Sequence, residues 1–151
     1  MIYSVALPDF VLVTGIMCGS SGDGIDLATC RFSTKDASFE FLNGKTFPLP
    51  EPWADRLQDL RKGSARLLAE TNVAFGHFLA GLVHCWIQES GLQPDLVACH
   101  GATIFHDPVD SRFSFQLGDG ETIAAHLSCP VVTDFRSKDI ALGGQGAPLV
   151  P

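Results

Sequence analysis

The order of the predicted secondary-structure elements constrains the fold most: three strand-like segments joined by short turns precede a long helix. Residues 10–17 form a nearly continuous apolar run rich in β-branched side chains, which predicts a buried strand. Strand-like segments at 25–32 and 38–47 follow, after turns at 18–24 and 33–36. Consecutive strands joined by short turns favour an antiparallel meander over a βαβ unit.

The second half of the chain alternates helices and strands. Residues 65–90 predict a long amphipathic helix capped by Gly91, after a shorter helix at 53–61. A buried strand at 95–99 is expected to enter a loop at 100–103, followed by an exposed strand at 113–117. A short helix at 120–127, a buried strand at 130–133 and a flexible loop at 143–148 complete the pattern. The fold class predicted is α/β, with a mixed sheet flanked by helices as in the ribonuclease H-like fold of actin, hexokinase and the Hsp70 ATPase.

Composition narrows the possible partners. The chain has 151 residues, enough for one domain, and a formal charge of −7 without a basic run longer than Arg61–Lys62, which argues against nucleic-acid binding. Its apolar stretches are too short to span a bilayer, so no membrane partner is expected. The five cysteines are odd in number and include no C-x-x-C pair, a usage typical of free thiols in a reducing compartment. We therefore expect a soluble cytoplasmic protein.

The glycine-rich segment at residues 19–26 is the most informative candidate site. Its glycines allow backbone N–H groups to approach an anion closely, and its serines add hydroxyl donors. Asp23 and Asp26 could hold Mg²⁺, so the segment suits a phosphate–metal site. It is neither a Walker A loop nor a dinucleotide fingerprint. An Asp-Gly hairpin turn without any ligand explains the same residues equally well.

Other candidate clusters have simpler structural explanations. Cys99, His100, His106 and Asp107 do not have the spacing of a known zinc site, and Cys99 is expected to face the core. No G-x-S-x-G sequence occurs, which argues against a serine hydrolase of that type. His77 and His84 are expected to be surface or packing residues, and Trp53 and Trp86 core anchors. Asp134 and Asp139 are equally consistent with substrate contacts and with capping or ion-pair roles.

Five sequence blocks resemble anhydro-N-acetylmuramic acid kinases in order and spacing: GIMCGSSGDGID at 15–26, ACHGATIFH at 98–106, FQLGDG at 115–120, TDFRSKDIA at 133–141 and GGQGAPLVP at 143–151. The resemblance implies an ATP-dependent enzyme of peptidoglycan recycling. Such kinases open the 1,6-anhydro ring of anhydro-N-acetylmuramate with water and phosphorylate O6, giving N-acetylmuramate 6-phosphate.

The resemblance also implies roles for individual residues. The ATP phosphates would be bound by Gly19, Ser20, Ser21, Gly22, Asp23, Gly24, Ile25 and Asp26. Asp23 and Asp26, which are candidate Mg²⁺ ligands by their chemistry, belong to this segment. His100, Gly101 and Thr103 would line the sugar side of the cleft. Arg136 would grip the lactyl carboxylate of the sugar, for which a guanidinium offers bidentate geometry.

Some residues of these blocks depart from the family. The family usually has Ser at Cys18, Thr at Ser20, Leu or Met at Gly22, and Gln at Ala102. Ser20 keeps the hydroxyl, whereas Gly22 loosens the loop and Ala102 removes a possible hydrogen bond to the substrate. Sugar affinity is therefore the property most affected.

Chain length is the larger departure. Family members are more than twice as long, and their second half supplies other phosphate loops, the adenosine pocket and the catalytic aspartate. The resemblance thus places no catalytic residue in this chain, and the catalytic base is expected beyond Pro151. We expect residues 1–151 to be the amino-terminal lobe of a two-lobe sugar kinase, inactive alone and homodimeric in its full-length form. The alternative is a non-catalytic phosphate- or sugar-binding or regulatory module.

Overall fold

The amino-terminal part of the fold is an antiparallel meander. The structure, a computed structural model, describes residues 8–19 and 24–147. Strand β1 (Phe10–Cys18) pairs with β2 (Gly24–Ser33), and β2 pairs with β3 (Phe39–Pro48), both antiparallel. The meander predicted from the short turns is confirmed.

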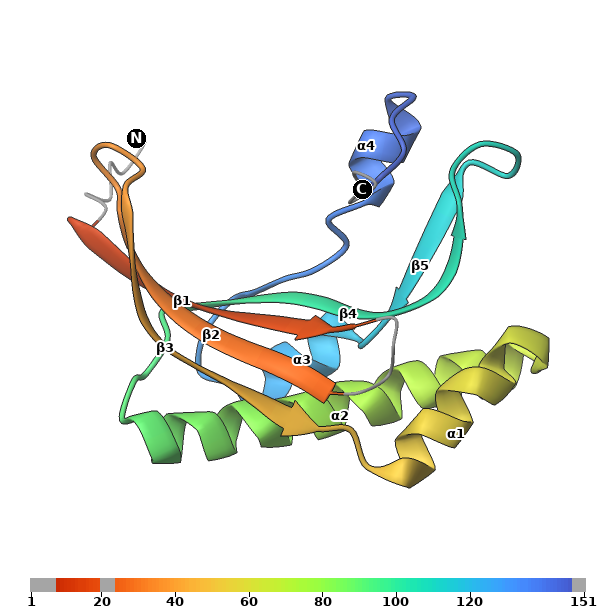
Figure 1. Ribbon diagram of the computed structural model, residues 1–151, viewed down its shortest axis with the longest axis horizontal. Helices are drawn as coiled ribbons and strands as arrows, with labels where there is room; N and C mark the ends of the chain where they lie inside the picture. The colour runs from red at the N-terminus through yellow and green to blue at the C-terminus, as the bar shows by residue number, and fades with distance from the viewer. Residues whose placement is uncertain (1–7, 20–23, 148–151) are drawn as a thin grey trace, which may run out of the picture.

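Parallel strands extend the sheet on the other side of β1. Strand β4 (Leu96–Asp107) runs parallel to β1, and the short β6 (Val131–Val132) runs parallel to β4. Strand β5 (Phe113–Leu117) pairs antiparallel with β4. The described residues thus form a six-stranded sheet with the order β3-β2-β1-β4-β5, and β6 also pairs with β4 (Figure 1). This mixed sheet confirms the predicted α/β class.

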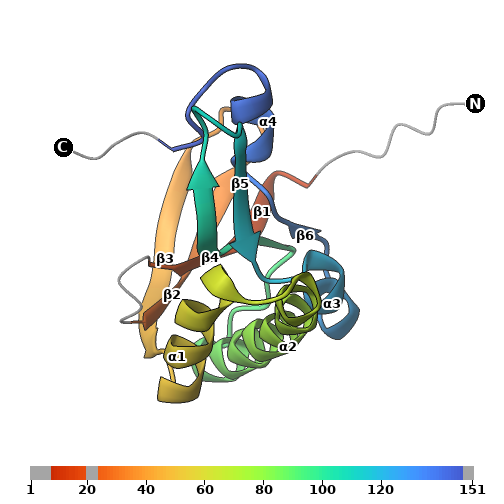
Figure 2. The ribbon, with the colours of Figure 1, turned by 90° about the vertical axis from the view of Figure 1, so that its right-hand side faces the viewer.

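Three helices cover one face of the sheet (Figures 1 and 2). Helix α1 (Glu51–Asp59) continues into a single 3-10 turn, η1 (Leu60–Lys62), and α2 (Ala65–Ser90) and α3 (Gly120–His126) follow. Helix α2 has the bounds predicted from its periodicity: the Ser64 hydroxyl accepts from Leu67 N at 3.1 Å, and Gly91 ends it with φ 70°. Helix α4 (Ser137–Ala141) lies apart, on the other side of the sheet, near β5.

The core lies between α2 and the covered face of the sheet. Fully or almost fully buried apolar residues fill it, among them Ile16, Ile25, Leu27, Phe75, Leu79, Val83, Val97 and Leu117. Two buried threonines form a polar link inside it: the Thr14 and Thr29 hydroxyls are 2.8 Å apart, and Trp86 Nε1 donates to Thr29 Oγ1 at 2.8 Å. Because every member has a partner, this network joins β1, β2 and α2 without an unsatisfied polar group.

The opposite face of the meander is apolar but exposed. Phe32 and Phe39 stack on neighbouring strands with ring centroids 5.7 Å apart, and Phe41, opposite Cys30, extends the same surface. Phe39 and Phe41 are 67% and 61% exposed. We call Phe32, Phe39 and Phe41 the phenylalanine surface.

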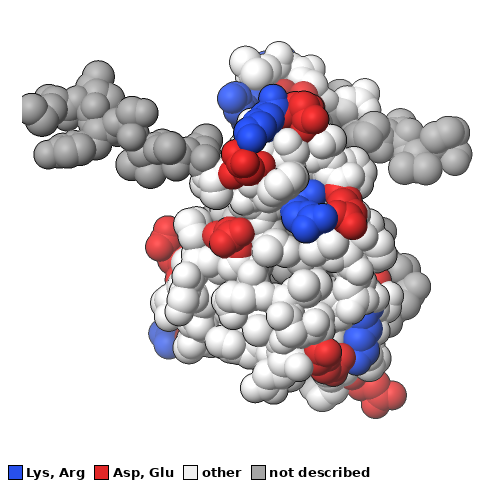
Figure 3. All heavy atoms as spheres, turned by 90° about the vertical axis from the view of Figure 1, so that its left-hand side faces the viewer, with Lys and Arg blue, Asp and Glu red and all other residues white. Residues whose placement is uncertain are grey.

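Charged side chains are distributed as mixed pairs in the described residues. Lys35 lies 2.8 Å from Asp9, Lys45 lies 2.5 Å from Glu89, and Arg31 pairs with Glu40. Figure 3 shows basic and acidic groups side by side on the face it presents, without a continuous basic patch. In the same described part of the chain, no helix has both the length and the apolar character needed to cross a membrane.

Two expectations for the second half of the chain were wrong in detail. Residues 100–103 are not a loop, because β4 continues to Asp107 and its outer half pairs with β5. The strand expected at 130–133 is only two residues long, and Val132 is 44% exposed because β6 lies at the margin of the sheet. Helix α4, within the segment 133–141, was not predicted, since five residues are too few to show a helical period.

Candidate functional site

A β-bulge at His100 creates the local geometry of the site. Cys99 lies opposite Ile16 of β1 and Gly101 lies opposite Met17, so His100 is an extra residue without a partner on β1. Gly101 has φ 70°, and a Cβ at this position would lie 2.2 Å from the Leu117 carbonyl oxygen. Only glycine fits there, because both the backbone conformation and the space exclude a side chain. The bulge therefore determines the direction in which the His100 side chain projects from the sheet.

His100 makes a hydrogen bond through each ring nitrogen. Arg136 Nε lies 3.1 Å from His100 Nε2, and His100 Nδ1 lies 3.0 Å from the Gly101 carbonyl oxygen. Because guanidinium nitrogens only donate, Nε2 must be the acceptor and Nδ1 must carry the proton. Burial lowers the pKa of His100, the Arg136 charge lowers it further, and the bond to Gly101 opposes them. Geometry and electrostatics both favour the neutral imidazole.

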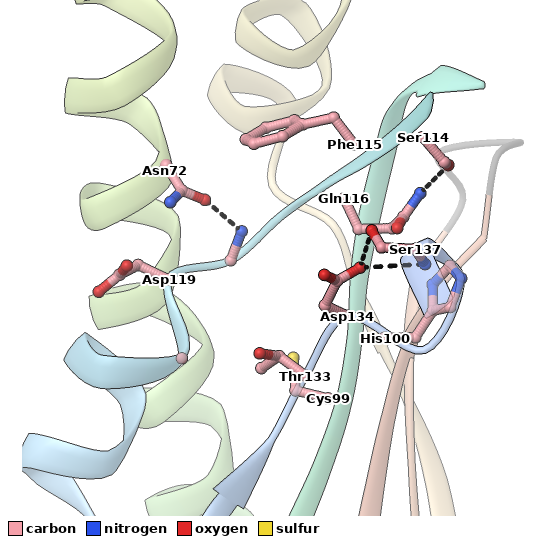
Figure 4. Close-up of a pocket in the computed structure, with 12 residues that line it drawn as sticks. Asn72, Cys99, His100, Ser114, Phe115, Gln116, Asp119, Thr133, Asp134 and Ser137 are labelled. Carbon is pink, nitrogen blue, oxygen red and sulfur yellow. Dashed lines mark hydrogen bonds between the residues drawn. The ribbon is translucent and has the colours of Figure 1, made fainter. Parts of the chain in front are cut away.

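A polar pocket of about 270 Å³ opens beside His100 (Figure 4). Its walls come from α2, β4, β5, the β5–α3 turn and the segment that leads into α4. The lining residues are Asn72, Cys99, His100, Ser114, Phe115, Gln116, Gly118, Asp119, Gly120, Thr133, Asp134 and Ser137. Hydroxyl, amide and carboxylate groups dominate, a lining that suits a ligand with several hydroxyl groups.

The β5–α3 turn forms one wall of this pocket and is held against α2. Asn72 Oδ1 accepts a hydrogen bond from Gly118 N at 2.8 Å, and the Asn72 carbonyl oxygen accepts from Asp119 N at 3.2 Å. Asp119 caps α3 by accepting from Thr122 N at 2.8 Å. The turn lies directly on Gly76, where a Cβ would be 2.9 Å from the Asp119 carbonyl oxygen. These contacts hold this wall of the pocket against α2.

Asp134 forms the wall next to His100. It has φ 60°, a left-handed conformation that is uncommon for residues other than glycine, asparagine and aspartate. Its Oδ1 accepts from the Ser137 hydroxyl at 2.5 Å, which ties the carboxylate to the start of α4. Of the two roles left open for Asp134, the capping-type contact is observed, and the residue also lines the pocket. Asp139 instead accepts from Gly146 N at 2.7 Å and orders the turn after α4.

The glycine-rich segment begins at the carboxyl end of β1, close to the bulge of β4. Cys18 lies opposite Ala102 in the parallel β1–β4 pair, so the connection after β1 begins beside the bulge. In open α/β sheets, ligands bind outside the carboxyl ends of such parallel strands. Ser20, Ser21, Gly22 and Asp23 lie outside the described residues; Gly19 and Gly24 flank them. Ile25 is fully buried, so only its backbone is available to a ligand.

Asp26, the second proposed Mg²⁺ ligand, is exposed on β2. Its Oδ1 accepts from the Thr46 hydroxyl at 2.5 Å, and within the described residues its other oxygen has no hydrogen bond. Gly24 is packed against β3, where a Cβ would lie 2.7 Å from Thr46 Cγ2. Among the described residues, only the Thr46 hydroxyl donates a hydrogen bond to the Asp26 carboxylate. Residues 8–19 and 24–147 contain no group of three or more acidic, histidine or cysteine side chains arranged for a metal.

The proposed sugar-side residues do not all meet at one place. His100 and Arg136 come together at the pocket, and the carbonyl oxygen of the buried Gly101 bonds His100. Thr103 instead lines a separate, more open hollow of about 440 Å³ with Arg61, Phe105 and His106. Sequence reasoning did not single out Asn72, Asp119 or Ser137 as pocket residues. Asp119 and Ser137 belong to the sequence blocks at 115–120 and 133–141 that resemble the family. Asn72 belongs to no such block, and its sequence context indicates only a position on α2.

The residues of the other candidate clusters make structural contacts. Cys99 is buried in the core, and burial raises the pKa of its thiol to about 11. His106 Nδ1 lies 3.1 Å from the Ser114 hydroxyl, and Asp107 accepts from Ser111, so these groups do not converge with Cys99. His77 is exposed, with its Nδ1 2.7 Å from His126 Nε2 between α2 and α3.

The mixed sheet and its covering helices have the ribonuclease H-like α/β architecture that sugar kinases share. A sequence model described as anhydro-N-acetylmuramic acid kinase matches residues 11–151, and the chain belongs to this family. The anhydro-N-acetylmuramic acid kinase of Vibrio cholerae is 37% identical over 147 residues, which are 93% of this chain and 39% of the relative. Those of Photobacterium profundum and Sulfurimonas denitrificans are each 38% identical, over 91% of this chain and 38% of their own length. The chain thus spans about two fifths of these relatives.

The catalytic base is expected beyond Pro151 and therefore outside the described residues. Pro151 itself lies outside residues 8–19 and 24–147, as does the segment 148–150 that precedes it. The last described residues follow α4, where Asp139 binds the backbone of Gly146. The location of the base therefore stays a prediction.

Proposed function

We propose that this chain is the amino-terminal lobe of an ATP-dependent kinase acting on 1,6-anhydro-N-acetylmuramate. The reaction would consume ATP and water, open the anhydro bridge and place the phosphoryl group on O6, giving N-acetylmuramate 6-phosphate and ADP. The family match and the relatives' names support the activity. The observation that carries the proposal for this chain is the half-buried Arg136, bonded to a neutral His100 beside a polar pocket.

Arg136 suits recognition of the lactyl carboxylate. Within residues 8–19 and 24–147, none of the ion pairs includes Arg136, so its charge is not neutralised there by a carboxylate. A half-buried guanidinium without an anionic partner favours an anionic ligand group. The hydroxyl and amide groups of the adjacent pocket would bind the sugar hydroxyls, with His100 and Gly101 on the sugar side. Thr103 stays a proposed sugar-side residue, although it lines the separate hollow and not this pocket.

The glycine-rich loop at 19–26 is the proposed site for the ATP phosphates. It leaves β1 beside the bulge, which would bring a phosphate near a sugar held at His100 and Arg136. Asp23 and Asp26 are the proposed Mg²⁺ ligands, and the exposed Asp26 carboxylate, which accepts from the Thr46 hydroxyl, supports this proposal. The metal would neutralise charge on the phosphate oxygens. We assign no catalytic base to the described residues, and propose that in a longer form the part beyond Pro151 supplies it.

Titration calorimetry and product analysis test this function. We expect the chain to bind 1,6-anhydro-N-acetylmuramate, and Arg136→Ala to weaken that binding about tenfold or more. We expect no turnover by the chain alone, and formation of N-acetylmuramate 6-phosphate, detected by mass spectrometry, once the missing part of the Vibrio cholerae relative is added. Unchanged sugar affinity in Arg136→Ala would contradict the proposed site.

A non-catalytic module is the second candidate. It rests on the same polar pocket, for which we assign no catalytic base among the described residues. The two candidates differ in one result: a module binds the sugar or Mg-ATP but yields no phosphorylated product when the missing part is supplied. Homodimerisation of a longer form remains a prediction, which light scattering would test.

A further inference from the structure

His100 accepts a hydrogen bond from Nε of Arg136, and this bond limits how the guanidinium can bind an anion. A guanidinium can bind a carboxylate along its side, through Nε and one terminal nitrogen, or at its end, through both terminal nitrogens. In this structure Arg136 Nε donates to His100 Nε2 at 3.1 Å. Only the end-on edge, with both terminal nitrogens, remains for a ligand.

We propose that His100 is a positioning residue, which acts as a neutral hydrogen-bond acceptor that turns the end-on edge of Arg136 to the carboxylate of the substrate. This inference rests on the proposed function and deepens it. It differs from a role for His100 as a direct sugar ligand, because both ring nitrogens already have protein partners.

The backbone holds the imidazole in this orientation. The bulge makes His100 the extra residue of β4, and Gly101 cannot carry a Cβ because of the Leu117 carbonyl oxygen. The bond from Nδ1 to the Gly101 carbonyl oxygen then fixes the tautomer with Nε2 as acceptor. A residue fixed by two hydrogen bonds orients the long Arg136 side chain at a smaller entropic cost than a mobile one.

Protonation of His100 would break its hydrogen bond with Arg136. An imidazolium has no acceptor, and it would place a second positive charge next to Arg136. The charged neighbour of His100 is Arg136, and the other titratable groups lining the pocket are Cys99, Asp119 and Asp134. Burial and the Arg136 charge both lower the pKa of His100, which keeps the acceptor form present at neutral pH.

Two variants of His100 test the proposal with two sugars. His100→Gln keeps an acceptor at about the position of Nε2, whereas His100→Leu removes it. Calorimetry would compare 1,6-anhydro-N-acetylmuramate with 1,6-anhydro-N-acetylglucosamine, which lacks the lactyl carboxylate. We expect His100→Leu to weaken binding of the first sugar about tenfold and to leave the second unchanged. His100→Gln should retain most of the affinity and lose its decrease at acidic pH. His84→Leu, at a remote histidine on α2, is the matched control.

The outcomes separate this inference from the proposed function. If Arg136→Ala does not reduce the preference for the carboxylate-bearing sugar, the proposed function fails. If Arg136→Ala reduces it but His100→Leu does not, or if His100→Leu weakens both sugars equally, the positioning role is overturned. Should the chain bind neither sugar, NMR of the ligand-free protein decides. The Arg136 Nε–H proton should exchange slowly in the wild type and in His100→Gln and quickly in His100→Leu; equal exchange in all three would refute the inference.

Discussion

Trp86 Nε1 donates a 2.8 Å hydrogen bond to the Thr29 hydroxyl, which in turn lies 2.8 Å from the Thr14 hydroxyl. All three side chains are at most 2% exposed, so the contact between α2 and the centre of the sheet includes a buried polar chain. Such a chain stabilises the fold only while each group keeps its partner.

Thr29→Val should therefore destabilise the chain although it conserves volume. It leaves the Trp86 indole N–H and the Thr14 hydroxyl without their buried partner, at a cost of about 2 to 4 kcal/mol. Thr29→Ser keeps the hydroxyl and should cost only about 1 kcal/mol, for the lost methyl group. Urea denaturation would measure both, and equal stability of the Val and Ser variants would contradict the role of the network.

Gly101→Ala should be much more damaging than the same change at Gly91. The two glycines have the same φ of 70°, but only at Gly101 would a Cβ meet a backbone atom, 2.2 Å from the Leu117 oxygen. We expect about 1 kcal/mol of destabilisation at Gly91, from the backbone conformation alone, and at least about 3 kcal/mol at Gly101. Thermal unfolding of the two variants gives the comparison. Similar losses would mean that the bulge relaxes to accommodate a side chain.

The stability contribution of His100 should be lost in acid. Its pKa is lowered in the folded chain from an ordinary value of 6.5, so the unfolded chain binds more protons as the pH falls below that value. The contribution is complete above the ordinary pKa and declines as the pH falls toward the folded one. The stability difference between wild type and His100→Gln should thus shrink as the pH falls through about 6.5 and below. A pH-independent difference would show that His100 does not titrate in this way.

Thiol reactivity should distinguish the cysteines of the folded chain. All five are free; Cys85 is exposed, whereas Cys18 and Cys99 are buried and burial raises the pKa of both thiols. Because the thiolate is the reactive form, iodoacetamide at about pH 8 should modify Cys85 first and Cys99 last. Peptide mass spectrometry would record the order, and labelling in denaturant should remove the difference. Early modification of Cys99 in the native chain would contradict its place in the core.

Sequence reasoning predicted the elements whose signals are local. The 26 residues of α2 span several turns and have an N-cap at Ser64 and a left-handed C-cap at Gly91, so both ends could be located. The bulge could not be predicted, because His100 and Gly101 read as a loop until β1 and β5 are present on either side. The pocket likewise joins Asn72 to Asp119 and Asp134, positions that no periodicity connects. Family resemblance identified His100 and Arg136 but did not show that they bond to each other.

The phenylalanine surface on β2 and β3 has a practical consequence for handling the isolated chain. Strand β3 is an edge strand, and the charges of Arg31, Glu40 and Lys45 lie on the strands that carry these exposed rings. Charged side chains on a sheet edge oppose edge-to-edge pairing, and the net charge of −7 keeps molecules apart. Salt screens both effects, and kosmotropic salts such as sulfate also strengthen the association of apolar surfaces. Concentrated samples of the chain should therefore remain soluble in buffer of low ionic strength and should aggregate as the ionic strength increases.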